Sequence, residues 1–419
     1  MSRLAFNSLA YALLQAARID AAIFAGQSLA EGMLARVEPV ARPAVQDLVY
    51  GSLRAYGRGD FFLSRLLERP LAVEEVRALL LVAFYRLETR PEATHTVVDQ
   101  AVSAAGEILH GKFRGLVNGV LRNFLRQQTE LVAAAAADAQ AAAQHPGWWL
   151  AQLQAAYPAD WPGIIAAGNS PPPMGLRVNR RLIGRDAYLA QLQTAGIAAQ
   201  PAGEVALALK RPLAVESLPG FADGLVSVQD PGAQRAAELL APAPGSRVLD
   251  ACAAPGGKTA HLLETADLDL LALDLKAARC RRIEENLSRL KLRARVAVAD
   301  CAKLESWWDG QPFDAVLADV PCTASGVVRR NPDAKWLRRE EDIASFAATQ
   351  ARILDALWRV VRPGGKLLYA TCSLFPLENS QQIARFLDRQ PQAIRRHEEQ
   401  LLPTAERDGF FYCLLEKRA

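Results

Sequence analysis

The chain has 419 residues, which is more than a single hydrophobic core usually organises, so we expect two or three domains. Apolar residues make up 51% of the chain, yet no run approaches the length of a membrane span, and charged residues interrupt the N-terminal region. We therefore expect a cytoplasmic protein without a membrane span or a secretory leader. A net charge of +4 is too small to identify a nucleic-acid partner by itself.

The cysteines are confined to the last two fifths of the chain. They form no Cys-x-x-Cys pair and no cluster with histidine, so neither a disulfide framework nor a zinc site is expected. A special cysteine in this chain should therefore act as a thiol, and no metal is expected. The six are Cys252, Cys280, Cys301, Cys322, Cys372 and Cys413.

Residues 1–140 carry helical signals almost throughout. Apolar side chains recur at three- and four-residue spacing, as between Leu79 and Leu87, and the alternation typical of strands is scarce. This pattern predicts an all-α domain over residues 1–140. The alanine-rich run Ala133 to Ala143 offers few large side chains to bury, and it predicts a helix tail or linker.

Residues 145–240 have a different texture. Strand-like pieces at Gly175 to Val178 and at Val205 to Leu209 flank a helical stretch at Arg185 to Ala195, with turn-rich segments between them. We interpret this region as a small α+β connecting module.

Residues 241–419 alternate short apolar pieces with helical stretches, which is typical of a doubly wound parallel sheet. The apolar pieces are Arg247 to Ala251, Asp269 to Leu273, Arg295 to Ala299, Phe313 to Ala318 and Lys366 to Ala370. An α/β domain of this kind binds its ligands at the carboxyl ends of the strands.

Four of the apolar pieces end in or run into an aspartate. One such aspartate alone is more often a helix cap, but four at equivalent strand ends indicate a common crevice. The four are Asp250, Asp274, Asp300 and Asp319.

A glycine turn follows the first of these strands, with the sequence Cys252-Ala-Ala-Pro-Gly-Gly-Lys-Thr259. It matches neither the dinucleotide fingerprint nor the phosphate-binding loop, so no phosphate site is supported. Asp274 stands about twenty residues beyond the turn, where an acid at a strand end can accept both hydroxyls of a ribose. Together the turn and the acid favour an adenosine-bearing ligand without phosphates.

Three motifs carry a resemblance to a known family. They are Val248-Leu-Asp-Ala-Cys-Ala-Ala-Pro-Gly-Gly-Lys-Thr259, Asp319-Val-Pro-Cys322 followed by Thr-Ala-Ser-Gly, and Tyr369-Ala-Thr-Cys-Ser373 followed by Glu378-Asn379. Together they resemble the RNA (cytosine-5) methyltransferase family. The resemblance implies a Rossmann-like class I methyltransferase domain that binds S-adenosyl-L-methionine, with Asp300 near the adenine and Asp319 between cofactor and base. The implied cofactor contacts are Cys252, Ala253, Ala254, Pro255, Gly256, Gly257, Lys258, Asp274, Asp300 and Asp319.

The implied reaction transfers a methyl group to carbon 5 of a cytosine through a covalent cysteine adduct. Carbon 5 is a poor nucleophile until a thiolate adds to carbon 6, and by resemblance that thiol is Cys372. Cys322 would assist release of the product, and Asp319 would hold the edge of the cytosine. Cys252 is expected to pack rather than react. The remaining cysteines, Cys280, Cys301 and Cys413, are expected to be inert core residues.

The N-terminal region carries a second resemblance. Tyr50-Gly-Ser-Leu-Arg54, His95-Thr-Val-Val-Asp99 and Leu116-Val-Asn-Gly-Val-Leu-Arg122 are similar to the helical domain of the antitermination factor NusB. Leu176-Arg-Val-Asn179 resembles the connecting module of the same methyltransferase branch. That branch modifies one cytosine of small-subunit (16S) ribosomal RNA, so the resemblance implies this RNA as partner and a monomeric enzyme.

Two groups of basic residues are candidates for RNA contacts. Those following the Cys322 loop are expected to meet backbone phosphates. Those of the N-terminal domain are equally well explained as an ordinary helix surface. The first group is Arg329, Arg330, Lys335, Arg338 and Arg339, and the second is Lys112, Arg114, Arg122 and Arg126.

Two alternative functions remain open at this point. A DNA cytosine-5 methyltransferase would use Cys322 of the Pro-Cys motif as its nucleophile and leave Cys372 without a role. A non-enzymatic RNA-binding factor with a relic cofactor fold would have no use for either thiol. The motif around Cys372 and the helical domain favour the RNA enzyme.

Overall fold

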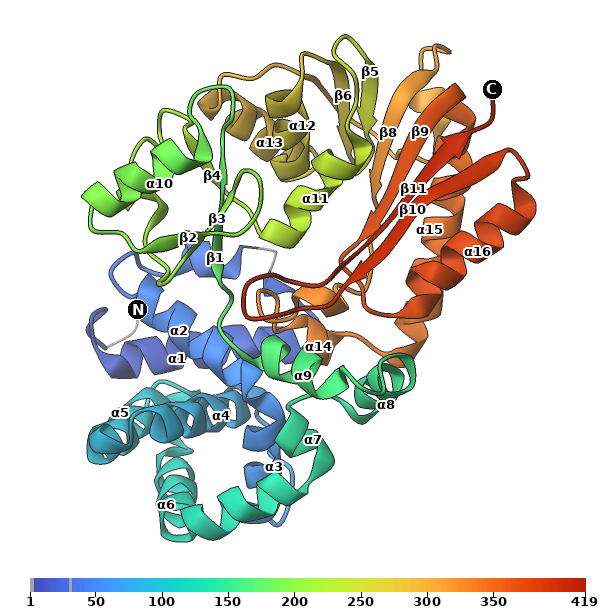
Figure 1. Ribbon diagram of the computed structural model, residues 1–419. Coiled ribbons are helices and arrows are strands. Elements are labelled where there is room, and N and C mark those ends of the chain that lie inside the picture. Colours follow the sequence, from blue (N-terminus) through green and yellow to red (C-terminus); the bar gives the residue numbers. More distant parts are fainter. Residues whose placement is uncertain (1–3, 30–31) are drawn as a thin grey trace. The chain divides into compact units, whose positions relative to one another are not determined.

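The computed structural model describes residues 4–29 and 32–419. Two compact units make up the chain, and each is described by itself (Figure 1). The first unit contains Met1–Ser170 and Val328–Arg339, and the second contains Pro171–Val327 and Glu340–Ala419. A short segment from the C-terminal half of the sequence therefore belongs to the helical unit.

The regular structure described in the first unit is helical, which confirms the all-α prediction. Ser8 caps the first helix by accepting a hydrogen bond from the backbone N–H of Tyr11 at 3.1 Å. The α-helices are α1 (Leu9–Phe24), α2 (Arg42–Arg54), α3 (Tyr56–Leu66), α4 (Glu74–Thr89), α5 (Thr94–Ala105), α6 (Arg114–Ala137), α7 (Ala139–Ala143), α8 (Gly147–Ala156), α9 (Trp161–Asn169) and α14 (Ala334–Leu337).

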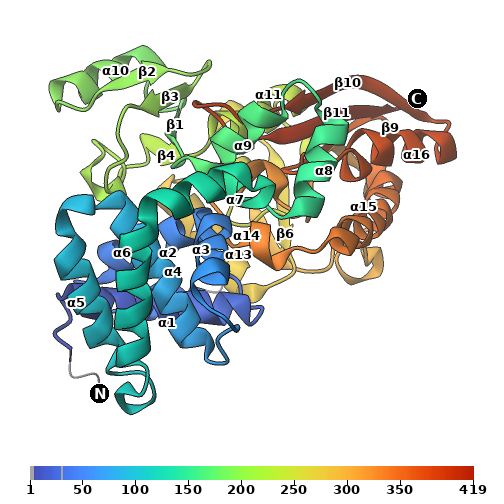
Figure 2. The same ribbon diagram turned by 90° about the horizontal axis from the view of Figure 1, so that it is seen from below.

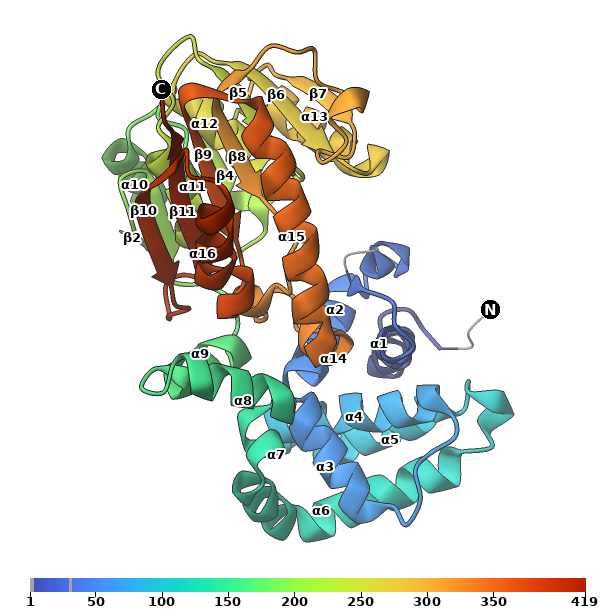
Figure 3. The same ribbon diagram turned by 90° about the vertical axis from the view of Figure 1, so that its right-hand side faces the viewer.

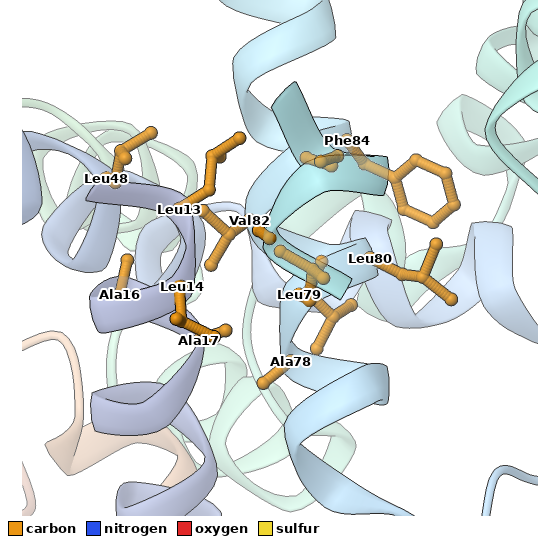
Figure 4. Close-up of a cluster of buried hydrophobic side chains, with 14 of the residues drawn as sticks. Leu13, Leu14, Ala16, Ala17, Leu48, Ala78, Leu79, Leu80, Val82 and Phe84 are labelled. Atoms are coloured by element: carbon orange, nitrogen blue, oxygen red, sulfur yellow. The ribbon is translucent and has the colours of Figure 1, made fainter. Parts of the chain in front are cut away.

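The core of the first unit is built around α4, which is apolar on nearly every side. Leu79, Leu80 and Phe84 of this helix are almost completely buried, and α1 contributes Leu13 and Leu14 to the same cluster (Figure 4). α1 packs on α2, α4 and α5, while α6 packs along α3, α4 and α5 (Figure 2). A helix that is hydrophobic all round is buried at the centre of a bundle, as α4 is here.

The second unit begins with a four-stranded antiparallel sheet in the order β2-β3-β1-β4. The two predicted strands and the predicted helix are confirmed, whereas the short edge strands β2 and β4 were not predicted. The elements are β1 (Met174–Val178), α10 (Arg185–Thr194), β2 (Ala199–Pro201), β3 (Ala206–Leu209) and β4 (Val226–Val228).

A seven-stranded sheet forms the rest of the second unit, in the order β10-β11-β9-β8-β5-β6-β7. The five predicted strands are present and parallel, while β11 and β10 extend the sheet with antiparallel pairing and were not predicted. The strands are β5 (Arg247–Asp250), β6 (Asp269–Asp274), β7 (Arg295–Val298), β8 (Phe313–Asp319), β9 (Val361–Thr371), β10 (Ala393–Leu401) and β11 (Phe410–Lys417).

Helices cover both faces of this sheet because successive strand residues point to opposite sides. Val248 and Leu249 of β5 illustrate this, since each joins a different hydrophobic cluster. One cluster packs α11 (Pro231–Leu240), α12 (Gly257–Thr265) and α13 (Ala277–Arg289) against the sheet. The other packs α15 (Glu340–Val360) and α16 (Ser380–Arg389), which Figure 3 shows in front of the strands. Among the described residues, we find no helix with the length and apolar character of a transmembrane segment.

Candidate active site

The order of the parallel strands reverses between β5 and β8. From β5 the chain proceeds outward through β6 and β7, whereas from β8 it proceeds in the other direction to β9. Such a switch point opens a crevice at the carboxyl ends of the strands. Asp250, Asp274 and Asp319 end β5, β6 and β8, and Asp300 stands two residues past β7. The strand bounds thus confirm that the four acids lie at equivalent strand ends.

A pocket of about 360 Å³ lies at this edge of the sheet. Its wall also includes Thr349, Arg352 and Ile353 of α15. The predicted site residues in the wall are Cys252, Ala254, Asp274, Asp300, Asp319, Cys322 and Cys372. The other predicted cofactor residues, Ala253, Pro255, Gly256, Gly257 and Lys258, belong to the adjoining glycine turn and the start of α12. The pocket volume falls within the range of small-molecule sites.

Local geometry explains why the turn carries glycine at position 256. Gly256 has a φ of 94°, in the left-handed region that side chains rarely adopt. A Cβ added there would lie 3.2 Å from the backbone Cα of Ile283 on α13. The turn is closed by hydrogen bonds from the N–H of Gly256 to the carbonyl of Ala253 and from the N–H of Ala253 to that of Leu273, at 2.7 and 2.8 Å.

Asp274 has the acceptor capacity that a ribose diol requires. Its carboxylate accepts the backbone N–H of Ala254 at 3.3 Å and that of Lys276 at 3.2 Å. The exposed Arg279 side chain pairs with the same carboxylate at 3.4 Å. A carboxylate offers about four lone-pair sites, so one acceptor position remains beside these contacts, and displacement of Arg279 by a ligand frees a second. Leu275, next in the chain, is 65% exposed in the same pocket and offers apolar surface. These residues fit the adenosine part of a cofactor.

Lys258 joins the glycine turn to the end of β8. Its ammonium lies 2.5 Å from a carboxylate oxygen of Asp319. Burial lowers the pKa of Lys258, but the Asp319 carboxylate outweighs burial and the net pKa shift is upward. Lys258 is therefore positively charged and holds Asp319 at the pocket wall.

Asp250 is the buried member of the four acids. It is 1% exposed, one of its oxygens accepts the hydroxyl of Thr259 at 2.6 Å, and the other has no hydrogen-bond partner. Burial raises its pKa to about 7, with a smaller contribution from the negative charge of Asp319. The prediction that all four acids line one crevice is therefore wrong for Asp250, which is outside the pocket wall and instead holds the start of α12 through Thr259.

We expect this carboxyl to make stability depend on pH. Its folded pKa of about 7 lies above the unfolded value of 3.8, so its stabilising contribution is complete below the unfolded pKa and is lost as the pH rises through about 7. The wild-type chain should lose roughly 2 kcal/mol relative to Asp250→Asn between about pH 5 and about pH 7. Denaturant unfolding of both proteins at the two pH values measures this difference. Parallel profiles would contradict a neutral Asp250.

The two cysteines with predicted chemical roles lie side by side in the pocket wall. The sulfur atoms of Cys322 and Cys372 are 3.3 Å apart. The hydrogen bond to Cys372 raises the pKa of the Cys322 thiol well above its ordinary value, and burial raises it further. Cys322 therefore keeps its proton, and its hydrogen-bond partner is the half-buried Cys372.

The other four cysteines occupy different surroundings. The sulfur of Cys252 lies 3.9 Å from that of Cys301, and Cys280 and Cys413 are buried outside the pocket wall. All six thiols are free. Within residues 4–29 and 32–419, no group of three or more potential ligand side chains has the arrangement of a metal site.

The prediction that the basic residues after the Cys322 loop meet RNA phosphates is wrong for Arg329 and Lys335. Both are almost completely buried, at 1% and 0% exposed, within the first unit. The ammonium of Lys335 donates to the carbonyl of Gln144 at 2.9 Å and to the side chain of Asn169 at 3.0 Å. Burial, and the charge of Arg54, lower its pKa to about 7.

The same segment is fixed by further contacts of the first unit. Asp333 accepts hydrogen bonds from the hydroxyl of Ser28 and the N–H of Leu29, at 2.9 and 3.0 Å. The indole of Trp336 donates to the carbonyl of Leu53 at 2.7 Å. The segment therefore has a structural role in the helical unit. By contrast, the second basic group on and before α6, Lys112, Arg114, Arg122 and Arg126, is exposed.

The strand order, the helical layer on each face and the glycine turn at the switch point define a Rossmann-like methyltransferase domain. Family models match three parts of the chain: 16S rRNA methyltransferase RsmB/F over residues 237–416, an RsmF/B-like ferredoxin-like domain over residues 145–216, and the NusB family over residues 8–126.

Curated relatives match nearly the whole length. The ribosomal RNA small subunit methyltransferase B of Vibrio cholerae is 43% identical over 94% of each chain, and that of Salmonella arizonae is 43% identical over 97% of this chain and 98% of the relative. Among solved structures, the crystal structure of PH0851 has a TM-score of 0.82 at 23% identity and covers 100% of both chains. The chain belongs to the 16S rRNA methyltransferase RsmB/F family, and it is an enzyme of the methyltransferase class.

Proposed function

We propose that the protein transfers a methyl group from S-adenosylmethionine to carbon 5 of a cytosine in small-subunit ribosomal RNA, with Cys372 as covalent nucleophile. The observation that carries this proposal is that two thiols, Cys372 and Cys322, share one pocket wall with Asp319, whose carboxylate pairs with Lys258 of the adjoining glycine turn. The names of the curated relatives support ribosomal RNA as the substrate class.

The cofactor half of the proposal rests on the carboxylates of the pocket. Asp274 retains acceptor capacity for the ribose hydroxyls, and Asp300, one of whose oxygens accepts the N–H of Ala302 at 3.0 Å, has a second oxygen for the adenine amino group. The glycine turn from Cys252 to Lys258 would enclose the methionine part. When bound, S-adenosylmethionine supplies an electrophilic methyl group.

The nucleophile is required because carbon 5 of cytosine reacts poorly by itself. In the proposed reaction the Cys372 thiolate bonds to carbon 6, and the electron pair of the C5–C6 double bond makes carbon 5 nucleophilic. Negative charge develops on the ring nitrogen N3 as the sulfur adds. The Lys258 ammonium, held by Asp319, can stabilise this charge, and the Asp319 carboxylate can accept a hydrogen bond from the N4 amino group.

Release of the product needs a base that takes the proton from carbon 5. Cys322 suits this step because the largest contribution to its raised pKa is the hydrogen bond to Cys372. That hydrogen bond is weakened once the Cys372 sulfur is bonded to carbon 6, so Cys322 releases its own proton to solvent more readily in the adduct. The thiolate so formed accepts the proton from carbon 5. Loss of the C5 proton restores the C5–C6 double bond and expels the Cys372 thiolate.

The test supplies the full-length protein with methyl-labelled S-adenosylmethionine and undermethylated small-subunit ribosomal RNA. We expect label in RNA, recovered after digestion as 5-methylcytidine. The same RNA isolated fully methylated is the matched control and should accept little label. Absence of transfer, or label on another nucleoside, would refute the proposal.

A further inference from the structure

Glu378 is a completely buried carboxylate that the reaction described above does not use. It lies at 0% exposure in the short 3₁₀ turn Pro376–Glu378 that precedes α16. Burial raises its pKa, against the hydrogen bonds that it accepts. A buried carboxylate is costly unless it is fully hydrogen-bonded, so its partners indicate what it holds.

Its partners come from both cysteine-bearing loops. One oxygen accepts the backbone N–H of Thr323 at 2.9 Å, and the other accepts the Thr323 hydroxyl at 2.5 Å. The second oxygen also accepts the hydroxyl of Ser373 at 2.5 Å. Thr323 directly follows Cys322 and Ser373 directly follows Cys372. One side chain thereby ties together the residues next to the two reactive sulfurs.

Two further contacts complete this arrangement. Gln350 of α15 donates to Glu378 at 3.0 Å and to the carbonyl of Pro321 at 2.9 Å, on the other side of Cys322. The N–H of Gly326 donates to the carbonyl of Cys372 at 2.8 Å, and a Cβ at Gly326 would lie 2.3 Å from the carbonyl oxygen of Gly409. The loops are thus fixed at close range around the sulfur pair.

We propose that Glu378 is the positioning residue that sets the distance between the Cys322 and Cys372 sulfurs. The expected effect of Glu378 on methyl transfer rests on the proposed function, in which Cys322 acts on the adduct that Cys372 forms. The role of Glu378 in setting the sulfur–sulfur distance does not depend on that function, because the 3.3 Å separation is a property of the folded chain. Glutamine at this position would lose the charge-assisted hydrogen bonds, and its NH₂ group would force the Thr323 and Ser373 hydroxyls to turn from donors into acceptors.

The geometric part is tested by disulfide formation in the full-length protein without RNA. Diamide takes two hydrogen atoms from the thiol pair and is reduced to the hydrazine as the S–S bond forms. Two sulfurs at 3.3 Å need only a small movement to reach the bonded length of about 2.05 Å. The rate of Cys322–Cys372 cross-linking, mapped by mass spectrometry of unreduced peptides, therefore reports their separation.

We expect Glu378→Gln to slow this cross-link at least about tenfold, and Glu399→Gln to leave it unchanged. Glu399 is a matched control because it pairs with Arg235 at 3.1 Å and does not contact either cysteine loop. A purely electrostatic role predicts the opposite, since Glu378 contributes, after the Cys372 hydrogen bond and burial, to the raised pKa of Cys322. Cross-linking of Glu378→Gln at the wild-type rate or faster would overturn the proposal.

A second, milder variant keeps the proposal testable if Glu378→Gln does not fold. Thr323→Val keeps the shape and the backbone N–H of Thr323 but removes one hydroxyl from Glu378, and we expect slower cross-linking in this variant too. In the RNA assay, Glu378→Gln should retain adduct formation on 5-fluorocytosine RNA while turnover on cytosine falls at least about tenfold. Turnover by Glu378→Gln at the wild-type rate would refute the positioning role. Absence of methyl transfer by the wild-type protein would refute only the proposed function.

Discussion

Replacing Cys372 by alanine is expected to lower methyl transfer by at least about 10⁴-fold, because removal of a covalent nucleophile eliminates the reaction path rather than slowing one step. Its sulfur lies in the same pocket wall as Asp319, and in the proposed mechanism it bonds to carbon 6 of a flipped cytosine. Binding of S-adenosylmethionine should change little. The measurement is single-turnover transfer of labelled methyl to undermethylated small-subunit RNA, with cofactor binding measured separately.

Trapping distinguishes the two thiols. On RNA that carries 5-fluorocytosine at the target, fluorine in place of the C5 proton blocks elimination, so the adduct accumulates. We expect this adduct to disappear in Cys372→Ala and to persist in Cys322→Ala. Cys413→Ala is the control, since Cys413 is buried in the sheet away from the pocket. An adduct that depends on Cys322 instead would indicate the arrangement of a DNA cytosine-5 methyltransferase.

The sequence predicted those parts of the fold whose signal is local. Helical periodicity identified the helices of residues 1–140, and the alternation of apolar pieces with helices identified the five parallel strands. β10 and β11 were missed for different reasons. β10 (Ala393–Leu401) is a charged edge strand with little apolar pattern, while β11 (Phe410–Lys417) begins with a continuous apolar run, which by itself does not distinguish a buried strand from a buried helix.

The candidate site was predictable because its polar residues follow the apolar strands at regular positions in the sequence. An acid at each strand end and a glycine turn after the first strand could be placed without coordinates. The Lys258–Asp319 pair could not, because its partners are far apart in sequence and only strand order brings them together.

Burial of charged residues was the main failure of sequence reasoning. Arg329 and Lys335 have the composition of a phosphate-binding loop, but tertiary packing within the first unit encloses them. Glu378 belongs to the Cys372 motif, yet its sequence position alone does not predict that it accepts hydrogen bonds from Thr323 and Ser373. The available signal was the pairing of hydroxyl residues immediately after each reactive cysteine.

Asp274→Asn is expected to weaken binding of S-adenosylmethionine about 10²-fold. The ribose hydroxyls would lose charge-assisted hydrogen bonds, each worth about 1.5–3 kcal/mol, and about 1.4 kcal/mol corresponds to a tenfold change in Kd. Asparagine also presents an amide donor where a hydroxyl donates. Because the carboxylate already accepts the N–H groups of Ala254 and Lys276, the variant should also loosen the glycine turn.

Isothermal titration of the full-length protein with S-adenosylmethionine and with S-adenosylhomocysteine measures this effect. Both ligands carry the same ribose, so both should weaken to a similar degree, which separates the ribose contact from any contact to the sulfonium charge. Asp388→Asn is the matched control, because Asp388 is an exposed carboxylate on α16 outside the pocket wall. A Kd for Asp274→Asn within about twofold of the wild type would contradict binding of the ribose hydroxyls by Asp274. Loss of a buried charge-assisted hydrogen bond weakens binding by more than that.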